Sequence, residues 1–399
     1  MLPTVVELFW YTPFAYTALT ALGQVVYRVR RKRLGKRPPP SKIIFQIPTI
    51  GNVETVNKIL ATVKGYGFKN METWVIIDEK NYKDTMKYNC DRLVIVPSIF
   101  ESTCLYKSRS LEYARRMRVN MYVRGELDDN YIVIQSDDDS LPSYDFMKEA
   151  IEVNSDITIG TITPRPLGHL VVDYERPVAC GMTCLFFTNI GIPVWAHGEG
   201  MVISARVDLN VSYEHDSKPL ISSEDMFYTH KTAYLAEDAY YADKSSRNSY
   251  KLYCSPKKVF ISPPLNPRDT ITQRRRWLWG HIRIIKNRML SAKSLVTIGI
   301  AESIGLITYA VATAGAILVP LGVIQLPPHS LALSYASLAM WFAMRGYNTG
   351  RVMGIIQGAR AALLSYITVT LNFAYHIIGL LKGDPKRFDV IKKYIPDKQ

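Results

Sequence analysis

The middle of this chain alternates between short apolar stretches and polar breaks, whereas both ends carry long apolar runs. Short apolar stretches that stop at polar residues are typical of buried strands. They predict strands at 43–47, 73–77, 92–96, 131–135, 157–162, 180–189 and 257–264. Helical spacing of apolar residues predicts helices at 57–66, 106–118 and 270–287, and one that begins near 221–227. Strand, helix and strand in this order predict an α/β fold with a mostly parallel, Rossmann-like sheet covered by helices.

The long apolar runs predict membrane helices at both ends of the chain. The first run is long enough to cross a bilayer of ~30 Å and is followed by seven basic residues between 28 and 37. Positive charge after the apolar residues predicts an uncleaved anchor with its basic end in the cytosol, and a buried or interfacial helix is the alternative. Apolar runs at 295–324, 331–344 and 361–381 predict about three further spans, although a basic C-terminus fits an even number better.

These patterns divide the chain into six regions. They are an N-terminal transmembrane helix (1–27), a basic and proline-rich linker (28–42), an α/β domain (43–270), an amphipathic interface helix (271–292), C-terminal transmembrane helices (293–381) and a basic tail (382–399). The formal net charge of +14 lies largely beside apolar segments, which favours a membrane surface over nucleic acid as the partner. The five cysteines form no C-x-x-C pair and have no histidine at zinc spacing, so we expect reduced structural thiols and a cytosolic domain.

Three consecutive aspartates follow the strand expected at 131–135. Because side chains alternate along an extended chain, Asp137 and Asp139 should point the same way and Asp138 the opposite way. Neighbouring carboxylates repel unless a cation lies between them, and Mg²⁺ or Mn²⁺ prefers such oxygen ligands and shares them with substrate phosphates. Asp78 ends another strand and should reach the same edge of the sheet. The alternative is a solvated acidic turn.

Other residues could complete a site for an activated, phosphorylated substrate. A diphosphate leaving group needs fixed cations, and the candidates are Lys107, Arg109, Arg274, Arg275 and Arg276. An acceptor hydroxyl needs a base, for which Asp225 or Glu224 at the start of a helix is suited. Gly198 and Gly200 lie in a loop of small residues that lets a ligand approach the backbone. Each motif has an alternative explanation. The basic residues could form a solvated helix face, and the Glu-Asp pair could simply be the acidic first turn of a helix. His197 could form a local hydrogen bond rather than bind a metal.

The order of these motifs resembles family 2 glycosyltransferases of the GT-A fold. The order is a strand-end aspartate, D-x-D followed by proline, a glycine-rich loop, Glu-Asp, and Gln273-Arg-Arg-Arg-Trp277 before apolar helices. The chain is also similar to the membrane-embedded branch of this family, which includes cellulose, chitin and hyaluronan synthases. The egghead-like β-1,4-mannosyltransferases are most similar, at residues 105–111, 223–228 and 273–277.

The resemblance implies a role for each motif. On the donor side it implies Asp78 at the nucleoside, Lys107 and Arg109 near the phosphates, Asp137 at the donor, Asp139 on the metal, and Gln273 and Arg276 at the pyrophosphate. On the acceptor side it implies Asp225 as general base and Trp277 at the acceptor end.

We therefore expect an inverting, metal-dependent glycosyltransferase with a nucleotide-sugar donor, GDP-mannose being favoured, and a lipid or glycan acceptor. Membrane lipids are expected partners and nucleic acid is not. The main alternative is a processive polysaccharide synthase that uses a UDP-sugar. A hydrolase with paired carboxylates and a lipid-binding scaffold without enzymatic activity are the remaining alternatives.

Overall fold

An eight-stranded sheet forms the centre of the α/β part of the molecule, with the strand order β3-β2-β1-β4-β7-β6-β8-β5. The computed structural model describes residues 11–166, 170–215, 223–240, 250–318, 321–322 and 328–385. The strands are β1 (Ile43–Thr49), β2 (Met71–Asp78), β3 (Arg92–Val96), β4 (Ile132–Gln135), β5 (Ser140–Pro142), β6 (Ile157–Pro164), β7 (Met201–Ser204) and β8 (Leu252–Ile261). The expected start of the N-terminal helix at 1–10, parts of the 295–324 run and most of the basic tail lie outside the described residues.

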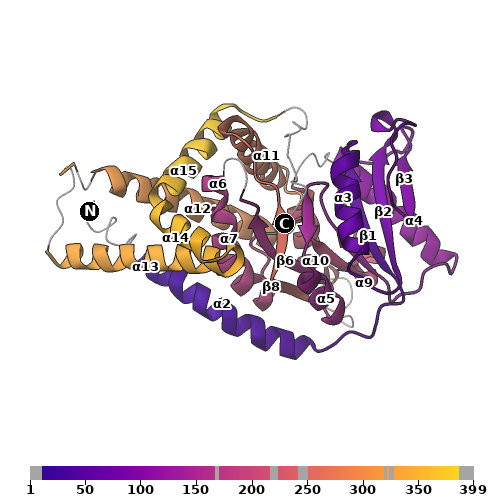
Figure 1. Cartoon of the computed structure of the whole chain (residues 1–399), viewed down its shortest axis with the longest axis horizontal. Helices are drawn as coiled ribbons and strands as arrows, with labels where there is room; N and C mark the ends of the chain where they lie inside the picture. Colours follow the sequence, from indigo (N-terminus) through magenta and orange to yellow (C-terminus); the bar gives the residue numbers. More distant parts are fainter. Residues whose placement is uncertain are drawn as a thin grey trace.

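Helices cover the sheet and continue beyond it (Figure 1). Those of the first half are α2 (Thr12–Leu34), α3 (Val53–Lys64), the 3₁₀ turn η1 (Glu79–Asn81), α4 (Lys107–Val123), α5 (Tyr144–Glu152), α6 (Leu170–Asp173) and α7 (Glu175–Ala179). A π-helical segment η2 (Cys180–Cys184) leads into α8 (Leu185–Phe187), the 3₁₀ turn η3 (Thr188–Ile190), α9 (Ala205–Asn210) and α10 (Glu224–Tyr240). The last helices are α11 (Pro267–Lys286), α12 (Ala292–Leu318), α13 (Pro328–Met353), α14 (Ile355–Leu363) and α15 (Ser365–Leu381).

The first half of the sheet is parallel, as the sequence predicts. β1 lies between β2 and β4 and runs parallel to both, and β2 runs parallel to β3. Every residue of β1 is buried, because helices cover both faces of a parallel sheet and its central strand then needs a nearly continuous apolar sequence. This arrangement brings the carboxyl ends of β1, β2 and β4 to the same edge.

The second half of the sheet is mixed, and since β6 runs parallel to β8, four of the seven strand pairs in the whole sheet are parallel, as expected. β7 is antiparallel to both β4 and β6, and β5 is antiparallel to β8. Met201, at the start of β7, pairs with Gln135 at the end of β4. The chain therefore enters β7 from the edge where β4 ends, so β7 has to run away from that edge. The antiparallel direction places the loop before β7 beside the three aspartates.

The expectation of a strand at 180–189 is wrong, because this segment is helical. Its buried residues include Cys180, Cys184, Leu185 and Thr188. The last three follow Cys180 by four, five and eight residues. These intervals place all four side chains on one side of a helix, whereas a strand would alternate them between its two faces. Gly23 of α2 packs against this side, since an added Cβ would lie 3.5 Å from Cβ of Leu185.

A buried polar network joins the parallel strands to the helices behind them. The Arg118 guanidinium donates to both carboxylate oxygens of Asp208, at 2.7 and 2.8 Å, and to Oε1 of Gln46 at 2.7 Å. The Tyr131 hydroxyl donates to Oδ2 of Asp208 at 2.8 Å. Arg118 and Asp208 are almost completely buried, so their pairing offsets the cost of removing two charges from water. The network fixes α4 and α9 against β1 and β4.

The N-terminal helix α2 touches both the sheet region and the C-terminal helices, and in Figure 1 it runs along one side of the molecule below α13. It extends beyond the expected boundary at 27 and ends at Leu34, because the basic residues after 27 continue its helical pattern. The Tyr27 hydroxyl donates to Oε1 of Glu149 at 3.0 Å, and the side-chain amide of Asn348 in α13 donates to Oγ1 of Thr20 at 3.2 Å.

The C-terminal helices α12 to α15 lie at the opposite end of the molecule from β1, β2 and β3 (Figure 1). Within the described residues, no single helix combines the length and the apolar composition needed to cross a membrane. The consecutive helices α14 and α15 meet both criteria only as a pair, with a bend of 68° between them.

Candidate active site

Lys107 connects two of the predicted acidic motifs. Its Nζ lies 2.6 Å from Oδ1 of Asp137 and 2.7 Å from Oε1 of Glu224. Lys107 begins α4 and Glu224 begins α10, and the residue before each has a positive φ, 55° at Tyr106 and 61° at Ser223. Such φ values are uncommon for residues other than glycine and are often found near active sites. Two helix starts and the end of β4 therefore meet at one point.

The three aspartates after β4 contact different residues. Asp138 accepts a hydrogen bond of 2.8 Å from the Thr49 hydroxyl at the end of β1. Asp139 is buried, with its Oδ1 3.4 Å from the Ser140 hydroxyl. Burial raises the pKa of Asp137 to about 7, with Lys107 opposing the shift and the charges of Glu199 and Asp139 adding to it.

The crowding of Asp137, Asp139 and Glu199 fits a divalent cation. The charges of Glu199 and Asp139 both disfavour the ionised form of Asp137, and a cation would relieve that repulsion. Oxygen atoms of carboxylates are also the ligands that Mg²⁺ and Mn²⁺ prefer. Asp137 and Asp139 are therefore suited to hold such an ion beside Lys107.

Asp225 has the environment of a general base. Its Oδ2 accepts a hydrogen bond of 2.8 Å from the backbone N–H of Gly198. Burial and the charges of Glu224 and Glu199 together raise its pKa to about 6, although Lys107 opposes the shift. A carboxylate with a pKa of about 6 is ionised at neutral pH and still basic enough to accept a proton efficiently.

The two glycines of the loop have different roles. A Cβ at Gly198 would lie 2.8 Å from Nζ of Lys107 and 3.5 Å from Cβ of Asp225, so the absence of a side chain lets this loop approach the charged centre. Gly200 has a φ of 71°, and a Cβ there would lie 2.7 Å from Cγ2 of Val259 in β8. Gly200 therefore serves the turn into β7, and no contact of its own faces the pocket.

Helix α11 brings the predicted Gln273, Arg276 and Trp277 to the same pocket as Lys107, Asp137, Glu224 and Asp225. Two guanidinium groups contact the Trp277 ring, with Arg176 at 4.6 Å and Arg274 at 4.7 Å from the ring centre. Arg176 also pairs with Glu199, with 3.3 Å between Nη1 and Oε1. The aromatic ring and the carboxylate therefore fix the Arg176 side chain in the pocket.

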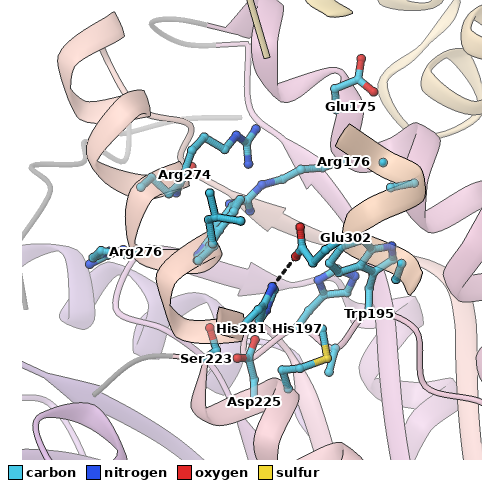
Figure 2. Close-up of a pocket in the computed structure, with 18 of the residues that line it drawn as sticks. Glu175, Arg176, Trp195, His197, Ser223, Asp225, Arg274, Arg276, His281 and Glu302 are labelled. Atoms are coloured by element: carbon cyan, nitrogen blue, oxygen red, sulfur yellow. Dashed lines mark hydrogen bonds and ion pairs between the residues drawn. The ribbon is translucent and has the colours of Figure 1, made fainter. Parts of the chain in front are cut away.

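The pocket continues from Asp225 to the C-terminal helices, and Figure 2 shows His281 between Asp225 and Glu302 along it. Nδ1 of His281, in α11, forms a hydrogen bond with Glu302 of α12. Asn372 and His376 of α15 also line this end. These residues were not predicted from the sequence. The signals were the single acid within an otherwise apolar run and the four-residue interval from Trp277 to His281, which places both on one face of α11.

Asp78 and Arg109 lie apart from the pocket lining and bind each other. Nη1 of Arg109 is 2.5 Å from Oδ2 of Asp78, and the same guanidinium donates to the carbonyl oxygens of Pro97 and Phe100. Arg109 thus supports the loop after β3. Arg176, which lines the pocket instead, was missed because its segment leads into the one misread as a strand.

Comparisons with known proteins identify the family of the chain. The model of a family described as glycosyl transferase family group 2 matches residues 132–344, just over half of the chain. Among solved structures, the chain is similar to the mannosyltransferase PcManGT from Pyrobaculum calidifontis in complex with GDP-Man and Mn²⁺. The identity is 16%, the TM-score is 0.44, and the match covers 94% of this chain and 98% of that chain. No curated protein matches the chain.

Proposed function

This chain belongs to glycosyl transferase family group 2, and we propose that it is an inverting, metal-dependent enzyme that transfers one sugar to a lipid-linked or membrane-delivered acceptor. Membership of this family makes it a nucleotide-sugar glycosyltransferase, and this decides against the hydrolase and the scaffold. The mechanism, the acceptor and the membrane location are the proposed parts.

The observation that carries the proposal is the position of Asp225 in one pocket with Asp137, Lys107 and the residues of α11. In the proposed reaction, the acceptor hydroxyl attacks the anomeric carbon from the side opposite the leaving nucleoside diphosphate. Asp225 removes the hydroxyl proton as the new bond forms, and the bond to the diphosphate breaks with inversion at that carbon. The Gly198 N–H holds one carboxylate oxygen of Asp225 in place during this step.

The charge that develops on the leaving group needs fixed cations around it. Arg276 lines the pocket, and Lys107 lies beside Asp137, so both are suited to bind the diphosphate. Gln273 is buried, and its Oε1 lacks a hydrogen-bond partner, which leaves it available to a ligand. Asp137 and Asp139 would hold Mg²⁺ or Mn²⁺, which would supply further positive charge for the diphosphate.

Two features support an acceptor that arrives from a membrane. The pocket extends to Glu302 of α12 and to Asn372 and His376 of α15, beyond the donor side. The outer face of α12 exposes a row of apolar side chains at helical spacing, each about half exposed. These are Val296, Ile300, Ile304 and Ile307. A continuous apolar row of this kind suits contact with lipid rather than water.

GDP-mannose is the donor that the motif resemblance favours. The second candidate function is that of a processive polysaccharide synthase that uses a UDP-sugar. The small number of apolar helices supports transfer of a single sugar, because a channel for a growing polymer needs more helices or an oligomer.

The test is a donor screen with the full-length protein in detergent or nanodiscs and a short lipid-linked sugar as acceptor. The donors tested are GDP-mannose, UDP-glucose and UDP-N-acetylglucosamine, each in the presence of Mg²⁺, Mn²⁺ or EDTA. The release of nucleotide and the stereochemistry of the product are measured. We expect transfer with GDP-mannose, inversion at the anomeric carbon and loss of transfer in EDTA. A product that retains the donor configuration, or full activity in EDTA, would contradict the proposal.

A further inference from the structure

Two cysteines of η2 converge with His197, which comes from the loop before β7 and also lines the pocket. Nε2 of His197 lies 3.2 Å from Sγ of Cys180 and 3.5 Å from Sγ of Cys184. The three ligand atoms all lie within 4.8 Å of one another, and both cysteines are fully buried. Within the described residues, this is the one group of three such side chains with that spacing.

The backbone prepares this cluster in two ways. Cys180 and Cys184 are four residues apart on a helical segment, an interval that places two ligands on one face, as in helical zinc motifs. The segment is π-helical, a conformation that is rare and frequently found at functional sites. His197 comes from the separate loop before β7 and approaches both sulfur atoms with the same nitrogen.

The geometry points to a binding site for a zinc ion, and we propose that Cys180, Cys184 and His197 coordinate Zn²⁺ through two sulfurs and one imidazole nitrogen. Thiolate and imidazole ligands are those that zinc prefers over magnesium or manganese. Bond lengths of about 2.3 Å to sulfur and about 2.0 Å to nitrogen in a tetrahedron place sulfur and nitrogen roughly 3.5 Å apart. The two contacts of His197 are close to this value. Three protein ligands leave a fourth position for water.

The cluster also favours the deprotonated thiol that a metal requires. A hydrogen bond from the Cys184 thiol, together with the His197 ring, lowers the pKa of Cys180 well below its usual value, whereas the same hydrogen bond and burial raise the pKa of Cys184 well above its own. Binding of zinc would release the remaining thiol proton of Cys184.

A zinc ion here would fix the loop that carries Gly198. His197 immediately precedes Gly198, whose N–H binds Asp225, and Glu199 follows with its contact to Arg176. Arg176 and Cys180 are themselves four residues apart in the adjoining helices α7 and η2. The ion would therefore join the η2 segment to the loop that orients the general base.

The test measures bound zinc in the full-length protein, purified under reducing conditions without a histidine tag. We expect about one zinc per chain for the unmodified protein and loss of zinc in Cys180→Ser, Cys184→Ser and His197→Asn. Cys104→Ser, which changes another buried thiol, and Asp137→Ala, at the other metal site, should retain zinc. Replacement of zinc by Co²⁺ should produce a thiolate-to-cobalt absorption band that is absent from the cysteine variants.

Stability gives a readout that does not depend on transfer activity. Removal of zinc with a strong chelator should lower the melting temperature of the unmodified protein, and zinc but not magnesium should restore it. The inference would be overturned by zinc-free protein in which Cys180 and Cys184 both react with an alkylating reagent. A disulfide between them in the reduced preparation, or unchanged zinc content in all three ligand variants, would overturn it too.

Discussion

The backbone N–H of Gly198 donates a hydrogen bond of 2.8 Å to Oδ2 of Asp225, and so the glycine loop and the base-bearing helix α10 meet at one carboxylate. The loop precedes β7, which runs antiparallel to β4, while Asp225 lies in the first turn of α10. The orientation of the proposed base therefore depends on the path of the chain into the sheet as well as on its own helix.

We predict that Asp225→Asn abolishes transfer while donor binding is retained. The amide can still accept the hydrogen bond from Gly198 but cannot remove a proton, and loss of a general base typically costs about 10²–10⁴-fold in rate. Transfer kinetics and calorimetric binding of GDP-mannose test the two parts. Asp84→Asn, at an exposed aspartate, is the control, and normal turnover in Asp225→Asn would exclude the proposed role.

The rate of transfer should depend on the ionisation of Asp225. The base acts only when ionised, so kcat/KM should rise with pH through about 6 and level off above it. Lys107 lowers this pKa and Glu224 raises it. Lys107→Met should therefore move the rising limb to higher pH, and Glu224→Gln should move it to lower pH. Shifts in the same direction in both variants would contradict the electrostatic explanation.

The two loop glycines should respond differently to alanine. In Gly198→Ala, the new Cβ would displace the Lys107 ammonium from the charged centre, and misplacement of about 1 Å in an active site can cost about 10²-fold in rate. In Gly200→Ala, the positive φ and the contact with Val259 should instead destabilise the fold, by about 2–4 kcal/mol.

Thermal unfolding and transfer kinetics, measured on both glycine variants, separate these two effects. Gly299→Ala is the matched control, because its Cβ would lie 3.9 Å from the nearest atom outside its own helix. A stable and fully active Gly200→Ala variant would show that the turn into β7 tolerates a side chain.

Asp137→Ala and Asp139→Asn should each raise the concentration of Mn²⁺ needed for half-maximal transfer. Each substitution removes an oxygen ligand or its charge, and the affinity of a hard cation depends on both. Metal titration of transfer activity measures the effect, with the exposed Asp145→Asn as the control. An unchanged metal requirement in both variants would place the cation elsewhere.

Asp208→Ala should destabilise the α/β part without touching the pocket. It leaves the Arg118 guanidinium buried without its carboxylate partner, and breaking a buried ion pair in this way typically costs about 3–5 kcal/mol. Denaturation followed by tryptophan fluorescence gives the change in the free energy of unfolding. Asp84→Ala, at an exposed aspartate, should change it by less than about 0.5 kcal/mol.

The sequence predicts those parts of the fold and site that depend on local pattern. The strand expected at 92–96 coincides with β3, and the aspartates after β4 are in the position that an apolar strand ending at carboxylates implies. The segment at 180–189 is misassigned because a short apolar run has no clear period until its packing partner α2 is known.

Long-range contacts are the part that local pattern does not contain. The sequence alone does not distinguish the roles of Arg109 and Arg176. Arg109 binds Asp78 and backbone carbonyls, whereas Arg176 lies against Trp277 in the pocket. The convergence of Cys180, Cys184 and His197 depends on the turn of the chain before β7, so the intervals between these residues do not predict the proposed zinc site.

The contacts of α2 have a consequence for biosynthesis. Thr20 receives its hydrogen bond from Asn348, 328 residues later, while Tyr27 binds Glu149 in the α/β part. During translation, the first helix leaves the ribosome long before α13 exists, and contacts between such distant positions form late. The nascent protein therefore cannot reach its final packing until almost the whole polypeptide has been made, and until then α2 presents an uncovered surface to chaperones.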